Sequence, residues 1–173
     1  MGERGRALVF FVRRSLSLDI ALLSLNCLPA KTRVLLTLRK YHALAGVLAG
    51  KPTHIPIGQA LVEVVDTFDV GTLLASIVDV GRLMRQVQLP ADHPVVVDVG
   101  ANIGQFCVAT KLFWPSAEVT SFEPDPEVGA RLRANTARLP DVTVFNVGLG
   151  QKDALLTWHA HKRSVLSSFR PRG

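Results

Sequence analysis

One segment constrains the fold of this chain more than any other. Residues 95–99 read VVVDV, and residues 100–104, which follow at once, read GANIG. A nearly continuous β-branched run is typical of a parallel strand covered on both faces. Glycines allow the backbone to turn tightly and to approach a ligand closely, where a Cβ would collide. With a helix over residues 105–113, the pattern predicts the first unit of an open α/β sheet.

The same order repeats downstream. Residues 118–123 predict a second strand, Asp125 and Pro126 are typical of the N-cap and first position of a helix, and residues 142–147 predict a third strand. Strand–helix–strand–helix–strand with short connections implies right-handed crossovers and a parallel sheet with helices on both sides. Residues 154–161 alternate enough to predict a further strand, antiparallel or in a hairpin.

The first half of the chain has a different pattern. Apolar residues recur at helical spacing over residues 31–49 and 69–83, and residues 54–65 predict short strands or an edge hairpin. We therefore expect three parts: a basic helical segment (1–51), strands and a helix leading into the core (52–93), and a ligand-binding sheet (94–173).

The net charge of +6 lies in the first of these parts. Residues 1–51 hold nine Lys and Arg against two acids, which gives +7, and the rest hold eleven against twelve, which gives −1. This segment is expected to pack on the core or to rest on an anionic membrane surface. Its apolar runs are shorter than the roughly 18–20 residues of a spanning helix. Its few aromatic residues argue against nucleic acid as a partner.

Two widely separated cysteines, Cys27 and Cys107, form no CxxC pair. They predict a reducing, cytoplasmic compartment, with peripheral membrane contact left open. His159 and His161 have no evident third ligand nearby in the sequence, so no metal site is predicted.

Carboxylates end the first two predicted strands. Asp98 belongs to the first, and Glu123 follows 25 residues later at the end of the second. Ligands of doubly wound folds sit outside the carboxyl ends of the strands, where a carboxylate can accept hydrogen bonds from both ribose hydroxyls. The pair therefore predicts a cofactor that contains a nucleoside.

The glycine turn narrows the choice of cofactor. Asn102 stands where a dinucleotide fingerprint would have its second glycine, and the sequence contains no GxxxxGK[ST] loop. Asp98 beside the ligand suits a cationic amino-acid end better than a pyrophosphate. S-adenosylmethionine fits these features, with its cationic end near Asp98 and its ribose on Glu123.

The sequence also contains SFEPDP (121–126), Asn135 and VFNVGLG (144–150). Together with the strand and glycine turn at residues 95–104, these motifs resemble FkbM-type methyltransferases over about residues 94–168. The resemblance implies a Rossmann-like class I methyltransferase fold and S-adenosylmethionine-dependent O-methylation of a sugar, a glycolipid or another small molecule. The cofactor-binding residues that it implies are Asp98, Gly100, Ala101, Asn102, Gly104, Glu123, Pro124, Val147 and Gly148.

One departure from the family keeps alternatives open. The family continues into a fourth strand with an Ile-Asp-Val-Glu-Gly-like motif, and no such motif precedes Gly173. The acceptor site and any catalytic base would normally come from there, so no catalytic residue is assigned. The chain is then either an active methyltransferase or a truncated, inactive remnant that still binds the cofactor or a partner. A NAD-dependent oxidoreductase is the third alternative, against which Asn102 argues. An unpaired edge on the first strand would invite self-association.

Overall fold

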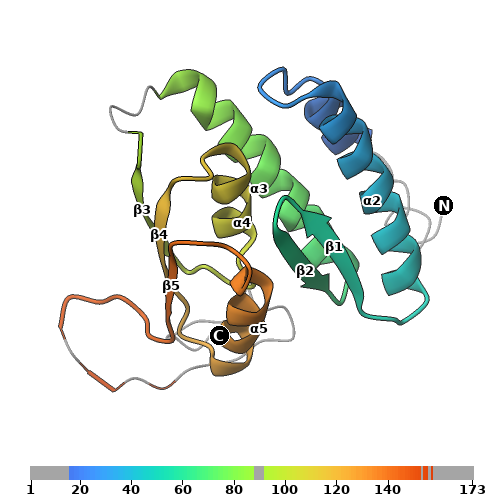
Figure 1. Cartoon of the computed structure of the whole chain (residues 1–173). Helices are drawn as coiled ribbons and strands as arrows, with labels where there is room; N and C mark the ends of the chain where they lie inside the picture. The colour runs from blue at the N-terminus through green and yellow to red at the C-terminus, as the bar shows by residue number, and fades with distance from the viewer. Residues whose placement is uncertain (1–15, 88–91, 153, 156, 158–173) are drawn as a thin grey trace. The chain divides into compact units, whose positions relative to one another are not determined.

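The computed structural model describes residues 16–87, 92–152, 154, 155 and 157. The chain divides into two compact units, one of residues 1–56 and 63–88 and the other of residues 57–62 and 89–173. Figure 1 labels the helices and strands of both units.

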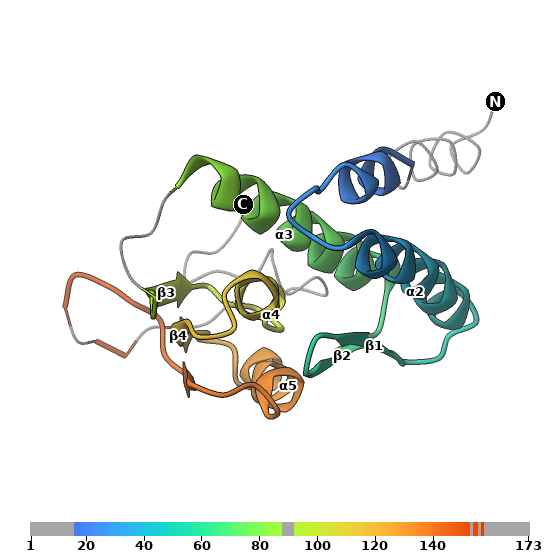
Figure 2. The ribbon, with the colours of Figure 1, turned by 45° about the horizontal axis from the view of Figure 1, so that its top comes forward.

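Helices make up most of the first unit. Residues 16–23 are helical, and α2 (Ala30–Leu48) and α3 (Thr67–Gln86) pack against each other (Figure 2). Both long helices confirm the expected ones. The second begins earlier than predicted because Asp66 caps it, accepting a hydrogen bond from the Asp69 N–H at 2.7 Å. The apolar residues that are buried on these two helices include Leu36, Ala43, Leu44, Val70, Leu73, Leu74, Ile77 and Val78.

A buried ion pair lies within this unit. Lys40 of α2 is only 2% exposed, and its Nζ donates to Asp19 Oδ1. The Tyr41 hydroxyl donates to the other oxygen of Asp19 at 2.6 Å. Asp19 interrupts an apolar run in the sequence, and the structure shows why it is tolerated: its carboxylate neutralises a lysine that has left water.

A hairpin follows α2. Strands β1 (Thr53–Ile57) and β2 (Ala60–Val64) form a two-stranded sheet, which confirms the expected hairpin. Gly58 turns the chain between them with a φ of 56°, a conformation that glycine adopts without strain. Alternate residues along the strands are buried: Ile55, Ile57, Ala60, Val62 and Val64.

The second unit contains the predicted parallel sheet. Its strands are β3 (Val95–Val99), β4 (Glu118–Phe122) and β5 (Val142–Phe145), in the order β3-β4-β5 and all parallel. Helices α4 (Gln105–Phe113) and α5 (Pro126–Thr136) connect them. The element order and pairing confirm the Rossmann-like α/β fold class. The third strand ends at Phe145, two residues earlier than predicted.

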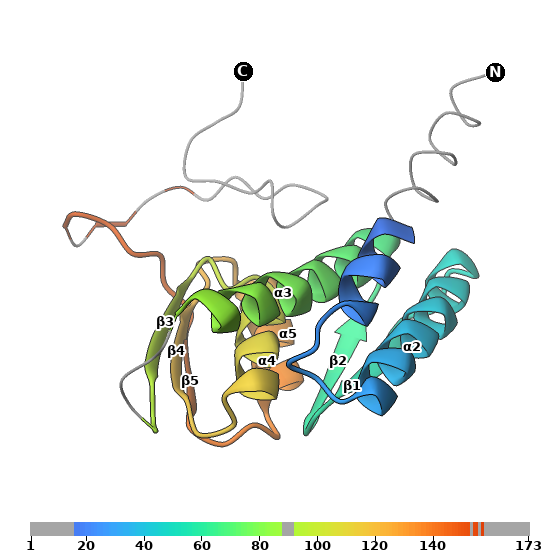
Figure 3. The same ribbon diagram turned by 90° about the horizontal axis from the view of Figure 1, so that it is seen from above.

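One face of this sheet is covered and the other is open. In Figure 3, α4 and α5 lie on the same side of β3, β4 and β5. The covered face includes a core of Cys107, Ala117 and Val119, against which Val96 and Val142 pack. Burial raises the pKa of the Cys107 thiol to about 12, so the thiol stays protonated and packs as an apolar group.

The prediction of helices on both sides is wrong for the described part of this unit. Val95, Val97 and Val99 are 71%, 59% and 60% exposed, so β3 is covered on one face only. The reason is the direction of the connections. Both crossovers advance the same way along the sheet, from β3 to β4 and from β4 to β5, and right-handed crossovers that advance in one direction place their helices on one face.

One further strand was predicted near the end of the given sequence. The predicted strand over residues 154–161 falls mostly outside the described residues, and Ala154, Leu155 and Thr157 are not in a strand.

None of the helices in the described part of the chain combines the length and the apolar character that a membrane-spanning helix needs.

We expect Asp19→Ala to lower the free energy of unfolding by about 3–5 kcal/mol, because it leaves the buried Lys40 ammonium without its carboxylate. Urea denaturation would measure this loss. The control is Asp79→Ala, which removes an exposed pair with Arg82 at 3.7 Å and should change stability by less than about 0.5 kcal/mol. Equal effects of the two variants would contradict this account of the buried pair.

Candidate functional site

The turn after β3 folds over the carboxyl end of β4. The N–H groups of Gly100 and Ala101 donate to the Phe122 carbonyl oxygen at 2.9 and 3.0 Å. Gly100 has a φ of 77° and Asn102 a φ of 50°, so the chain reverses through two left-handed residues. The Asn135 side chain, from α5, donates to the Ile103 carbonyl at 2.9 Å and is buried there. The turn is therefore held from two neighbouring elements.

The two glycines of this turn have different reasons to be glycine. Gly100 needs its positive φ, and a Cβ there would meet nothing within 4 Å, so its outer side is open. Gly104 also has a positive φ, of 96°, but a Cβ there would lie 2.9 Å from Leu132 Cδ1. Gly104 thus allows the start of α4 to pack closely on α5, and Gly100 leaves room beside the turn.

The Glu123 side chain links the turns that follow β3 and β4. Its Oε2 accepts the Asn102 N–H at 2.9 Å, and its Oε1 accepts the Asp125 N–H at 3.0 Å. Burial raises the pKa of Glu123, and these two hydrogen bonds oppose that rise. Each carboxylate oxygen keeps a second lone pair, so the group is held in one orientation and can still accept hydrogen bonds from a ligand.

Asp98 has a buried oxygen that is not satisfied. The residue is 8% exposed, and its Oδ2 is buried with no hydrogen-bond partner in the part of the chain that the structure describes. Burial, and secondly the charge of Glu123, raises the pKa of Asp98 to about 6. A buried acceptor without a donor is costly, so this carboxylate is suited to a ligand that brings donors or positive charge.

The structure adds Asn146, which sequence reasoning missed. Its Nδ2 donates to the Glu123 carbonyl at 2.7 Å and to the Asp125 carbonyl at 3.2 Å. A Cβ at Gly129 would lie 2.8 Å from that nitrogen, so the glycine leaves space for the amide. Asn146 is the first residue after β5, and a polar residue at the end of a third strand was the signal that could have found it.

The predicted site residues are not all equally close to this cluster. Asp98, Ala101, Asn102 and Glu123 come together where β3 and β4 end, and Pro124, half-buried, follows Glu123 directly. Val147 and Gly148 follow Asn146 and are exposed. At the end of β5, Asn146 is the residue that takes part in the hydrogen bonds described above.

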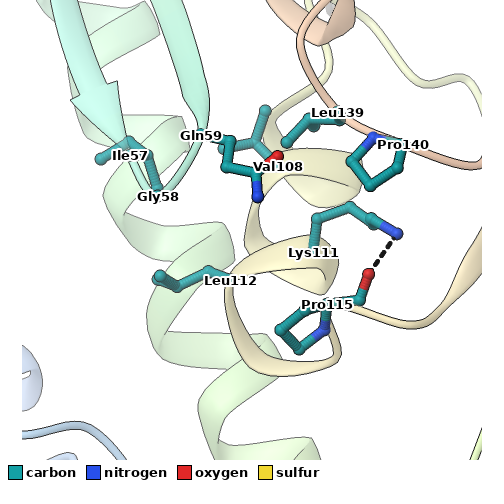
Figure 4. A pocket seen from close by; sticks show the side chains of 9 residues that line it. All are labelled: Ile57, Gly58, Gln59, Val108, Lys111, Leu112, Pro115, Leu139 and Pro140. Carbon is teal, nitrogen blue, oxygen red and sulfur yellow. Dashed lines mark hydrogen bonds between the residues drawn. The ribbon is translucent and has the colours of Figure 1, made fainter.

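A separate cavity of about 230 Å³ lies within the second unit (Figure 4). Its lining includes Gly58 and Gln59 of the hairpin turn and Val108, Lys111 and Leu112 of α4. The Lys111 ammonium donates to the carbonyls of Pro115 and Ala117 at 2.5 and 2.7 Å. Lys111 therefore holds the loop after α4, and none of the predicted cofactor residues lines this cavity.

Comparison with known proteins finds three related sequences, while no protein-family model matches. The chain is 32% identical over 80 residues to the 2-O-methyltransferase NoeI of Sinorhizobium fredii, which is 45% of this chain and 33% of that protein. It is 52% identical over 44 residues to the 31-O-demethyl-FK506 methyltransferase FkbM of Streptomyces tacrolimicus, 25% of this chain and 17% of the relative. It is also 44% identical over 68 residues, 39% of this chain and 3% of the relative, to the AMB antimetabolite synthetase AmbE of Pseudomonas aeruginosa.

The matches span at most a third of the length of these curated relatives. A crystal structure of coclaurine N-methyltransferase bound to N-methylheliamine and SAH aligns with 84% of this chain and 52% of its own, at 16% identity and a TM-score of 0.39.

A parallel sheet with a glycine turn after one strand and a carboxylate after the next defines the class, a Rossmann-like α/β fold with a candidate nucleoside site. Within that class, the matched segments of this chain are similar to a 2-O-methyltransferase and to an FkbM methyltransferase. The relatives confirm the resemblance predicted from its strand-end motifs.

We expect Asp98→Asn to raise the free energy of unfolding at pH 7 relative to the wild type, by about 2 kcal/mol. The folded-state pKa of Asp98, about 6, lies above its ordinary value of 3.8. The native state therefore binds this proton more tightly than the unfolded state does. The stabilisation that results is complete below pH 4 and is lost as the pH rises through 6.

Urea denaturation at pH 4 and pH 7 tests this, with the exposed Glu118→Gln as control. The asparagine variant should gain stability over the wild type at pH 7 only. A gain of the same size at both pH values would contradict the raised pKa of Asp98.

We expect Asn146→Ala to cost about 1–2 kcal/mol of stability, because two carbonyl oxygens lose their donor. Asn146→Asp should cost more, since it places a carboxylate oxygen against those carbonyls. Thermal unfolding measures both, and Thr143→Ala, an exposed change on β5, is the control. Equal losses of stability in the alanine and aspartate variants would mean that the Asn146 amide nitrogen does not stabilise this turn.

Proposed function

We propose that this chain binds S-adenosylmethionine at the carboxyl ends of β3 and β4 and takes part in methyl transfer to a hydroxyl of a sugar, a glycolipid or another small molecule. The observation that carries the proposal is the unsatisfied, buried oxygen of Asp98 beside the oriented carboxylate of Glu123. The Asp98 oxygen suits a cationic group, and the Glu123 carboxylate suits a pair of vicinal hydroxyls.

The residues present fit this cofactor. Asp98 would hold its ammonium end, Glu123 its ribose, and the open side of Gly100 would leave room for the chain between them. Pro124, Val147 and Gly148 would border the adenine. When bound, S-adenosylmethionine supplies a methyl group on a positively charged sulfur, which an acceptor oxygen can attack.

The protein's part in such a reaction is to bind and to orient. Both Glu123 oxygens are held by backbone N–H groups, so the carboxylate does not have to be ordered when a ribose arrives. Burial of Asp98 strengthens its attraction to a cation, because less water screens the charge. No residue of this chain is assigned the role of catalytic base.

A hydroxyl acceptor is supported by the names of two relatives. One is a 2-O-methyltransferase, and the other is a methyltransferase of 31-O-demethyl-FK506. Both names describe methylation of an oxygen. Because each match covers a third or less of the relative, the acceptor of this chain is proposed only as a class, a hydroxyl on a small molecule or a glycan.

Calorimetric titration with S-adenosylmethionine tests the proposal. We expect binding that weakens at least tenfold in Asp98→Ala and in Glu123→Gln, about 1.4 kcal/mol or more. The matched control is Glu118→Gln, an exposed carboxylate at the other end of β4, which should bind as the wild type does. NAD should not bind.

The pH dependence adds a second readout. A cation stabilises the ionised form of Asp98, so affinity should rise between pH 5 and pH 7 as a carboxyl with a pKa of about 6 ionises. A folded wild-type chain that binds no S-adenosylmethionine would refute the proposed function. Binding that Asp98→Ala leaves unchanged would place the cofactor elsewhere.

A further inference from the structure

The helix α2 carries apolar residues on two opposite faces. One face packs inside the first unit, where Leu36, Ala43 and Leu44 are buried (Figure 2). The opposite face carries large apolar side chains that remain exposed, namely Val34, Leu35, Leu38, Tyr41 and Leu48. Steps of three, four and seven residues bring these side chains to one side of a helix. We call these five residues the outer stripe of α2.

The outer stripe is a continuous surface and not a scatter of single residues. Val34, Leu38 and Leu48 are 50%, 62% and 70% exposed. From residue 34 to residue 48 the helix rises by about 21 Å. A helix that is apolar all round is normally buried all round, and a contiguous exposed apolar surface marks a site of interaction. The outer stripe therefore predicts a partner that offers an apolar surface.

The charge around the outer stripe is positive. Residues 30–62 contain five Lys and Arg and no Asp or Glu. Asp19 neutralises one of the five, the buried Lys40. Lys31 and Lys51 are exposed, and they lie three residues before the first and three residues after the last residue of the stripe. A partner with negative charge is complementary to this surface.

We propose that the outer stripe of α2 lies on an anionic lipid surface, with Lys31 and Lys51 at the phosphates. A lipid surface has an apolar layer directly beneath a layer of negative charge. Lysine side chains can reach the head groups while their methylene stems stay on the apolar layer. A second copy of the same face would instead bring like charges together. The contact does not involve any of the predicted cofactor residues.

Flotation of the full chain with lipid vesicles tests the proposal. We expect binding to phosphatidylcholine vesicles that contain about one third phosphatidylserine, and at least tenfold weaker binding to phosphatidylcholine alone. Binding to the anionic vesicles should weaken as the salt concentration rises, because salt screens the attraction between the lysines and the head groups.

The apolar part of the contact is tested by Leu38→Gln, which removes a leucine from the middle of the stripe without changing the charge. Vesicle binding should weaken about tenfold. Because Leu38 is exposed, thermal unfolding should stay as in the wild type. The matched control is Leu83→Gln on α3, a leucine 40% exposed and outside the stripe, which should bind vesicles as the wild type does.

The charged part is tested by replacing both Lys31 and Lys51 with glutamine. This variant should bind anionic vesicles about tenfold more weakly than the wild type does. Its control replaces Arg138 and Lys152 with glutamine, which removes the same number of charges from exposed positions of the second unit. The control should keep the preference for anionic vesicles.

Four results would overturn the proposal. One is a folded wild type that does not bind anionic vesicles, and another is equal binding to the two kinds of vesicle. The third is an equal loss of binding in Leu38→Gln and Leu83→Gln. The last is a wild type that ignores vesicles and forms dimers which Leu38→Gln dissociates, since a second copy would then cover the outer stripe.

Discussion

The arrangement of the site depends on one carboxylate. Glu123 accepts a backbone N–H from the turn after β3 and another from the turn after β4. Asn146, from the end of β5, donates to the carbonyl of the same residue. Three strand ends are therefore joined at Glu123, and the parallel register of the sheet brings them to the same level. A ligand at this edge would meet groups already held in place.

This cluster has a cost in stability that is typical of functional sites. Two carboxylates, Asp98 and Glu123, are buried close enough for the charge of one to raise the pKa of the other, and burial raises both pKa values. The hydrogen bonds to Glu123 offset part of its cost, whereas Asp98 keeps a buried oxygen without a partner among the described residues. A perturbed acid at the end of a parallel strand is a reasoned candidate for ligand binding.

The direction of the chain decides how the sheet is covered. Both connections of the second unit advance the same way, so α4 and α5 protect one face, while three valines of β3 and Phe145 of β5 stay exposed on the other. Phe145 stacks on Phe122 of β4, with ring centroids 5.3 Å apart, and this is the main aromatic contact of the open face among the described residues.

The sequence by itself determined the local elements of this protein. β-branched runs predicted the strands, Asp125 before Pro126 predicted the start of α5, and the glycine turn with Asp98 and Glu123 predicted the site, because each of these signals acts over a few residues. Tertiary structure alone decided that Asn146 binds the turn after β4, that Gly104 packs against Leu132, and that β3 is open on one face. These features depend on residues far apart in the chain, and only the packing of the strands and helices brings such residues into contact.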